Sequence, residues 1–396
     1  MSLLEIGVYS TINKIIEINN ASFTVARKGS YNTCIEILNE LKAQNMNFMI
    51  NKNSIKKVAI ALVLATSSAS AIAQDVHFTQ FTATPLLINP AFTGNNNGLF
   101  RASAIYRNQW ASVTVPFKTI VVSIDAPLIQ DISTDDYLAF GAQFYNDVAG
   151  DGNLTNFTGL LSVAYHKFLG ASQNKVLSVG MQAGYSQKSF DLSKLYFPDE
   201  FLNGGFQPGT SQEYPFLGTK ISYYTVNTGI SFSHRTSDRF SYTLGVGANN
   251  INQPQESFIT KKNSEVGLGM RFTGQFGAIW QVGEKFSLRP TALFQSQSTA
   301  TEIVVGNEFH MIMGNPEFHS IAKALFLGTY YRLDDAALFT FGIDFNGTRL
   351  GVSYDYNTSK LKSASNGNGG FEISATFIAP NPLDFARRLV YPCARF

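Results

Sequence analysis

The chain has 396 residues, a formal net charge of +2 and charged side chains at only 15% of its positions. Soluble globular domains carry charge at about a quarter of their residues, whereas this chain is rich in Phe (33), Tyr (17) and Gly (32). Few charges and many aromatic rings suit a surface that faces lipid and is anchored by rings at its two rims. The near-neutral balance argues against a nucleic-acid partner, which would require a basic face.

An export signal is expected well inside the printed chain. Three lysines precede the apolar run Val58–Ala65, and small residues then lead to Ala71-Ile72-Ala73. This order is that of a secretory signal peptide, and the run is shorter than the ~20 residues of a spanning helix. We expect 1–45 to be an upstream extension produced by a start assigned too early, and 46–73 to be a signal peptide cleaved after Ala73. A genuine soluble extension is the alternative, and it would have to explain why a signal sequence follows it.

From residue 98 onward, apolar and polar residues alternate almost everywhere, as in Leu177–Tyr185 and Phe371–Phe377. A period of two indicates strands with one apolar and one polar face. Most runs have about nine to fourteen residues, which is long for soluble strands and right for strands that span a membrane. Counting them gives about fourteen strands, at 99–110, 116–126, 137–146, 155–167, 176–187, 221–234, 239–249, 269–282, 285–297, 300–309, 323–332, 337–346, 348–357 and 370–378.

The predicted fold is therefore all-β, a single antiparallel transmembrane β-barrel of about fourteen strands over 99–379. The sheet must close on itself, because lipid offers no partner to an open backbone edge. We expect 74–98 to be an N-terminal periplasmic segment and 380–396 a C-terminal periplasmic tail. Short turns should face the periplasm, and the long connections 188–220 and 250–268 should lie outside the cell.

The alternation also predicts which side chains meet lipid. Val179 lies on the apolar face of its run and Gly180 on the polar face. An arginine at Val179 should therefore be costly in mid-membrane. A serine at Gly180 should be mild, because the polar face is expected to line the lumen.

Three short motifs follow one another at the start of the predicted mature chain. The first is F-T-Q-F, the second is a turn that reads N-P-A-F-T-G, and the third is Y-R-N-Q-W at the end of the first predicted strand. Together they resemble the start of the PorP/SprF family of type IX secretion and gliding-motility membrane proteins. The residues that carry the resemblance are Gln80, Phe81, Asn89, Pro90, Ala91, Gly94, Tyr106, Arg107, Asn108, Gln109 and Trp110. Weaker similarities continue to the last residues, where Ala394 replaces the Pro of the family's C-P-R-F ending.

Two interpretations of these motifs stay open. In the first the motifs are structural: Pro90 prevents a helix, Gly94 frees the backbone before the first strand, and Trp110 sits at the membrane boundary. Arg107 would then point into the lumen and help to seat the barrel. In the second the motifs contact a partner.

Catalysis is not expected, and the protein is predicted not to be an enzyme. The five histidines are scattered and lack the spacing of zinc ligands. No G-x-S-x-G elbow occurs, and no nucleophile can be matched with a base. We therefore predict no catalytic residue, no cofactor and no metal.

The resemblance implies an accessory role in type IX secretion, in which the barrel helps large surface adhesins to leave the cell or to stay attached outside it, as in gliding motility. Its partners would be outer-membrane lipid, a secreted adhesin and periplasmic components of the secretion system. The rival function is a channel or transporter for small solutes or fatty acids, since the same fold serves both.

The connection 188–220 is the candidate partner-binding loop, because it is longer than a hairpin requires and unusually apolar. A second possibility is that it folds inward and plugs the barrel. Its candidate contact residues are Leu195, Tyr196, Phe197, Phe201, Phe206, Tyr214 and Phe216.

Overall fold

The computed structural model describes residues 76–380, apart from 113–114, 134, 171, 203, 260–266, 314–322 and 360–361. The expected extension 1–45, the signal peptide 46–73 and the tail after Pro380 lie outside these residues. All described residues belong to one compact unit of the chain. In the described part, no helix is both long and apolar enough to cross a membrane.

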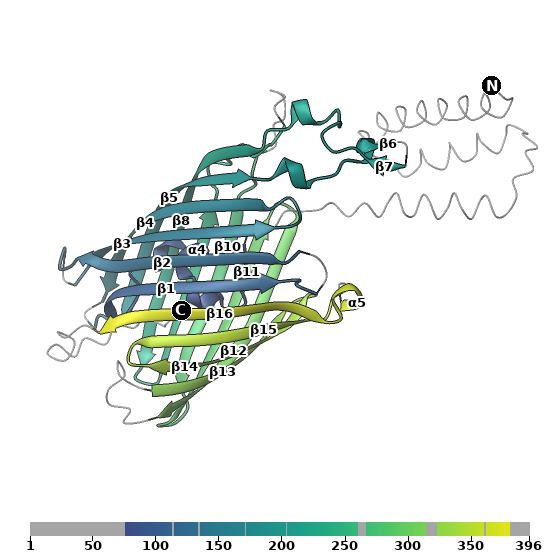
Figure 1. The fold of residues 1–396 in the computed structure, drawn as a ribbon. Helices are drawn as coiled ribbons and strands as arrows, with labels where there is room; N and C mark the ends of the chain where they lie inside the picture. The colour runs from purple at the N-terminus through teal and green to yellow at the C-terminus, as the bar shows by residue number, and fades with distance from the viewer. Residues whose placement is uncertain are drawn as a thin grey trace, which may run out of the picture. The chain divides into compact units, whose positions relative to one another are not determined.

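The strands form a closed antiparallel barrel, in which β1 pairs with β16 and every other strand pairs with its neighbours along the chain (Figure 1). The predicted fold is thus confirmed, and the predicted runs differ from the strands by only a few residues at their ends. The wall consists of β1 (Gly98–Gln109), β2 (Phe117–Ile129), β3 (Tyr137–Ala149), β4 (Leu154–Leu169), β5 (Lys175–Ser189), β8 (Lys220–Ser237), β9 (Phe240–Asn249), β10 (Arg271–Gln281), β11 (Phe286–Gln297), β12 (Ala300–Met313), β13 (Lys323–Arg332), β14 (Ala336–Phe345), β15 (Thr348–Asn357) and β16 (Asn368–Pro380).

Side chains alternate between the two faces of this wall as the sequence predicts. On β14, Phe339 and Phe341 are half exposed on the outer surface, whereas Thr340 between them is buried on the inner one. Val179 likewise faces outward, with 45% of its surface exposed. An apolar exterior around a polar interior is the arrangement of a barrel that stands in lipid.

The two ends of the barrel differ in the length of their connections. One end, called here the turn end, holds the first residue of β1, the last of β16, and short turns such as 238–239 and 346–347. The other, the loop end, holds the connections 190–219 and 250–270. Because barrels of this kind have short periplasmic turns and longer outer loops, we expect the loop end to face outward.

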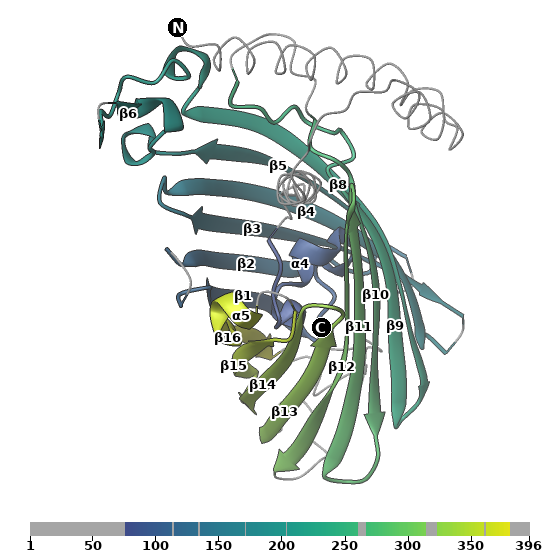
Figure 2. The ribbon, with the colours of Figure 1, turned by 90° about the vertical axis from the view of Figure 1, so that its right-hand side faces the viewer.

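Residues Val76–Asn97, called here the lumen segment, precede the wall and lie inside it (Figure 2). They contain two 3₁₀ turns, η1 (Phe81–Ala83) and η2 (Pro90–Phe92), and one helical turn, α4 (Pro85–Ile88). This position differs from the periplasmic one expected for 74–98. The alternation that reveals strands carries no signal for a short irregular segment that fills the space between them.

Candidate functional site

The lumen segment runs along the barrel from the loop end to the turn end. His77 lies 3.8 Å from Glu302, close to the start of β12 at the loop end. Further along, the backbone N–H of Gly94 donates to Asp125 at 2.7 Å, near the turn end of β2. Between these points the segment bonds to strands on opposite sides of the barrel, so it crosses the lumen.

A carboxylate at the seam of the barrel holds the start of the segment. Glu372 on β16 accepts the backbone N–H groups of Thr79 at 2.8 Å and Gln80 at 2.9 Å. It also pairs with Arg107, its register partner on β1, and Arg107 donates to Asp355 on β15 at 2.8 Å. All three charged side chains are buried. One acid therefore joins the first strand, the last strand and the lumen segment.

Asn89 organises the middle of the segment. Its Oδ1 accepts the N–H of Ala91 at 2.9 Å, which caps η2, and Pro90 supplies the first residue of that turn. Its Nδ2 donates to the carbonyls of Ile230 at 3.2 Å and Val246 at 3.1 Å on two neighbouring strands. A buried amide with all these partners ties the turn to the wall.

Glycines in the wall make room for this turn. A Cβ on Gly180 would overlap the backbone of Pro90 and Ala91, and one on Gly229 would overlap the Asn89 side chain. Such strand glycines mark places where another backbone approaches closely. The expectation that a serine at Gly180 would be mild is therefore wrong, because the lumen face at this point is already occupied.

The end of the segment is anchored near the turn end. Arg101 donates to both oxygens of Asp125, at 3.0 and 2.9 Å, and to the carbonyl of Phe92 at 2.9 Å. His166 Nε2 lies 2.7 Å from the Thr93 carbonyl and must donate to it, since a carbonyl only accepts. Gly94 has a φ of +67°, which glycine adopts freely.

The motif residues therefore fall into two groups. Seven of them line the contact between segment and wall: Gln80, Phe81, Asn89, Pro90, Ala91, Gly94 and Arg107. Phe81 packs edge-on against Tyr330 at 6.1 Å, and Gln109 accepts from Arg107 at 3.2 Å. The others lie elsewhere on the wall. Tyr106 is part of the outer surface, Asn108 is half-buried, and Trp110 packs against Phe117 at the loop end with ring centres 5.0 Å apart. The structural interpretation of the motifs accounts for these contacts.

A second buried charge cluster was not found from the sequence. Glu308 on β12 accepts from Arg349 at 2.5 Å, from Tyr330 at 2.8 Å and from His310 at 2.9 Å. Arg349 also stacks on Phe326, 3.9 Å from the ring centre. Residues so far apart in sequence give no local pattern, although their polar-face positions on β12, β13 and β15 could have pointed to the lumen. Within the described ranges, no three His, Cys, Asp or Glu side chains come together as metal ligands would.

The connection 190–219, called here the outer loop, folds around the carboxylate of one of its own residues, Glu200. Glu200 is fully buried, and its carboxylate accepts the N–H groups of Phe197 at 3.0 Å and Gly209 at 2.7 Å. These bonds hold the pKa of Glu200 below its usual value, because they favour the ionised form. They also frame a small hairpin of β6 (Phe201–Leu202) and β7 (Gly205–Phe206).

The predicted contact residues lie on this loop, and four of the seven remain exposed. Tyr196, Phe201, Phe206 and Phe216 keep between 49% and 63% of their surface exposed. Phe206 packs against both Tyr196 and Phe201, at 5.4 and 5.1 Å. Phe197 and Tyr214 form a neighbouring ring pair, and Leu195 is half-buried against Gly152.

The outer loop is attached to other loop-end connections. Phe190 packs against Phe258 at 4.9 Å, Lys188 pairs with Glu256 at 2.5 Å, and Asp191 donates its N–H to the carbonyl of Gly152 at 2.7 Å. Figure 1 shows β6 and β7 beyond the ends of the wall strands. The segment that lies in the lumen is thus Val76–Asn97, whereas β6 and β7 of this loop lie beyond the wall.

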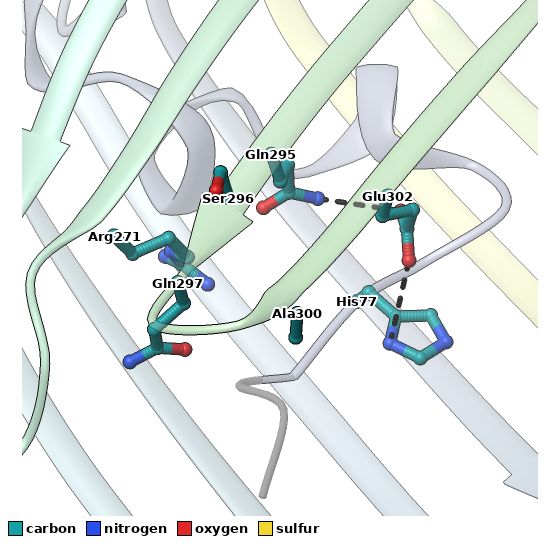
Figure 3. A pocket seen from close by; sticks show the side chains of 7 residues that line it. All are labelled: His77, Arg271, Gln295, Ser296, Gln297, Ala300 and Glu302. Carbon is teal, nitrogen blue, oxygen red and sulfur yellow. Dashed lines mark hydrogen bonds and ion pairs between the residues drawn. The ribbon is translucent and has the colours of Figure 1, made fainter. Parts of the chain in front are cut away.

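Small spaces remain beside the lumen segment. One of about 30 Å³ lies at the loop end among His77, Arg271, Gln295, Ser296, Gln297, Ala300 and Glu302 (Figure 3). Another, of about 20 Å³, lies between the segment and β3, β4, β5 and β8. Each is about the size of a water site. Where these spaces lie, the packing leaves room for water and not for a larger solute.

A family model described as "Type IX secretion system membrane protein PorP/SprF" matches residues 70–377. The chain belongs to the PorP/SprF family. The match spans the lumen segment and nearly the whole wall, so it confirms the resemblance seen in the opening motifs. A closed barrel with an apolar exterior in this family of membrane proteins is an outer-membrane protein.

No curated protein matches this PorP/SprF chain. Among solved structures, similar folds include the CymD monoaromatic hydrocarbon channel, at 9% identity over 76% of this chain and 93% of that one, with a TM-score of 0.41. The P. putida toluene transporter TodX is similar at 10% identity over 75% and 94% of the two chains, with a TM-score of 0.40. Likeness at this level carries no argument about solutes.

Proposed function

We propose that this PorP/SprF barrel is a closed, non-catalytic component of type IX secretion that binds a large secreted adhesin at its loop end. The binding would help the adhesin to leave the cell or to remain attached outside, as in gliding motility. Periplasmic components of the secretion system would meet the turn end and the tail 380–396.

The lumen segment that crosses the barrel is the observation that carries this proposal. A solute channel needs an open path, whereas the lumen segment bonds to walls on opposite sides of this barrel, through Glu372 on β16 and through Ile230 and Val246 on β8 and β9. A channel function would require these buried bonds to break on every opening. A binding function leaves them intact.

The exposed rings of the outer loop are the second observation that supports the proposed binding function. Phe201, Phe206 and Tyr196 present adjoining rings to solvent on a framework that is already ordered. Exposed apolar patches commonly mark interaction sites, and preformed aromatic anchors lose little entropy on binding. The candidate partner surface is therefore the set predicted from sequence: Leu195, Tyr196, Phe197, Phe201, Phe206, Tyr214 and Phe216.

The test replaces three exposed rings together, Tyr196→Ser, Phe201→Ser and Phe206→Ser, in the full-length chain. We expect normal barrel assembly, no leak of small solutes, and loss of one surface protein from the cell. The matched control is Gln207→Ala with Gln212→Ala, which changes exposed side chains of the same loop. An unchanged set of surface proteins in the triple variant would contradict the proposal.

A further inference from the structure

The path of the lumen segment fixes where the chain enters the barrel. His77 shares a small pocket with Ala300, the first residue of β12, and Gln297, the last residue of β11 (Figure 3). Thr79, two residues on, accepts a hydrogen bond at 3.5 Å from Arg332, the last residue of β13. These wall residues all border loop-end connections. The first described residues of the segment therefore lie at the loop end.

The same path fixes where the segment leaves. Gly94 contacts Asp125 and Ala139, close to the turn-end limits of β2 and β3. The chain then begins β1 at Gly98, which pairs with Pro380 at the end of β16. The segment thus threads the whole barrel before the wall begins. The buried bonds of Thr79 at one end and Gly94 at the other set its direction.

The reach of the chain limits where a processed N-terminus can be. If cleavage follows Ala73, the residues before His77 are Gln74, Asp75 and Val76, which extend at most about 10 Å. A return to the turn end would have to cover a distance comparable to β1, whose 12 residues rise roughly 40 Å. It would also have to pass a lumen that the segment already occupies.

We infer that the mature N-terminus is presented at the loop end, on the outer side of the membrane, while the last strand ends at the turn end. Its tip then adjoins the mouth of the barrel on the side that carries the outer loop. A partner that binds the loop end would meet this tip as well. This topology of the chain holds whether or not the partner is an adhesin.

The experiment places an epitope tag with a flexible linker between Gln74 and Asp75 of the full chain. Two matched arms carry the same tag in the outer loop, between Gln207 and Pro208, and in the turn-end connection, between Ser172 and Gln173. Antibody binding is measured on intact cells and again after the outer membrane is opened. Heat-modifiable migration confirms that each barrel has assembled.

We expect the N-terminal and outer-loop tags to bind antibody on intact cells, and the turn tag to bind only after opening. An N-terminal tag that behaves like the turn tag would overturn the inference, and so would a turn tag that is reached on intact cells. If the N-terminal tag prevents assembly, Asp75→Cys in a Cys393→Ser chain is probed with a membrane-impermeant maleimide. Labelling from outside supports the inference, and labelling that requires opening overturns it.

Discussion

The lumen segment and the outer loop are built from similar parts and ordered by different means. Each has a buried carboxylate that accepts two backbone N–H groups: Glu372 for the lumen segment and Glu200 for the outer loop. Glu372 belongs to the wall and is paired with Arg107, whereas Glu200 belongs to the loop that it orders. The lumen segment is therefore part of the barrel, and the outer loop is an accessory that can change without it.

The burial of their aromatic rings shows the same division. Phe78, Phe81 and Phe92 of the lumen segment are at most 3% exposed, whereas Phe201 and Phe206 of the outer loop are more than half exposed. Rings of the first kind stabilise the fold through the area they remove from water. Rings of the second kind remain available to the partner that we propose. Changes in the two regions should thus affect different measurements, assembly in one and binding in the other.

Loss of Glu372 should have the largest effect. In Glu372→Ala, Arg107 and two backbone N–H groups lose their shared acceptor, and removal of one member of a buried ion pair costs about 3–5 kcal/mol. We expect little folded barrel, measured as the heat-modifiable fraction in detergent. The control is Glu284→Ala, at an exposed turn-end residue. Glu372→Gln keeps a side-chain oxygen that can accept from Arg107 or the backbone, so it should assemble better than Glu372→Ala, and an equal defect would contradict the argument that this acceptor holds the seam.

The next largest effect is expected from a charge placed on the lipid-facing surface. Val179→Arg exposes a guanidinium to the hydrocarbon core and should cost about 2–4 kcal/mol, read from unfolding in urea. The outer loop offers the contrast, because Phe216→Arg changes a similarly exposed apolar residue that lies in the loop beyond the wall. Equal losses in the two variants would mean that Val179 does not face lipid.

A serine at Gly180 should cost about 1–3 kcal/mol, as overpacking does, because its side chain meets the backbone of Pro90 and Ala91. It should also loosen the lumen segment and raise the uptake of small solutes. The control is Gly274→Ala, since a Cβ there makes ordinary contact with Phe294. If Gly180→Ser leaves both stability and uptake unchanged, the position of the Asn89-Pro90 turn is incorrect.

The smallest effect concerns pH and the outer loop alone. Because the N–H groups of Phe197 and Gly209 lower the pKa of Glu200 from its usual 4.5, the ionised form stabilises the loop. That stability is complete above pH 4.5 and is lost as the pH falls toward the lowered pKa. Protease cleavage within 190–219 should therefore increase in acid while the wall stays resistant. In Glu200→Gln the increase should become smaller but not vanish, since the N–H of Gln212 also lowers the pKa of Asp199 in the same loop. An unchanged acid dependence would show that Glu200 does not order the loop.

These regions also show how far the sequence could predict the molecule. Alternation located the strands and the facing of Val179, because a wall between lipid and lumen repeats every two residues. It could not locate the lumen segment, and it could not predict that a side chain at position 180 would collide with that segment. Both depend on contacts between Pro90 and a distant strand. The opening motifs named the contact residues Asn89 and Arg107 without revealing their partners. The partners of Arg107 follow from the closure of β1 against β16, and those of Asn89 from the passage of the lumen segment beside β8 and β9.

The outer loop was easier to find, because its length and aromatic content are local properties. Its internal hydrogen bonds could not be predicted, since nothing in the local sequence Pro198-Asp199-Glu200 indicates that Glu200 is buried. Whether the loop or another segment filled the lumen could not be decided from composition, because both contain several apolar residues.

The most direct test of the central claim, that the lumen segment closes the barrel, is the conductance of the purified protein in a planar lipid bilayer. The wild-type barrel should carry no steady ion current, whereas a variant lacking residues 76–94 should form open channels once it has assembled. Assembly of that variant is checked beforehand by heat-modifiable migration. A wild-type barrel that conducts as well as the deletion variant would contradict the account.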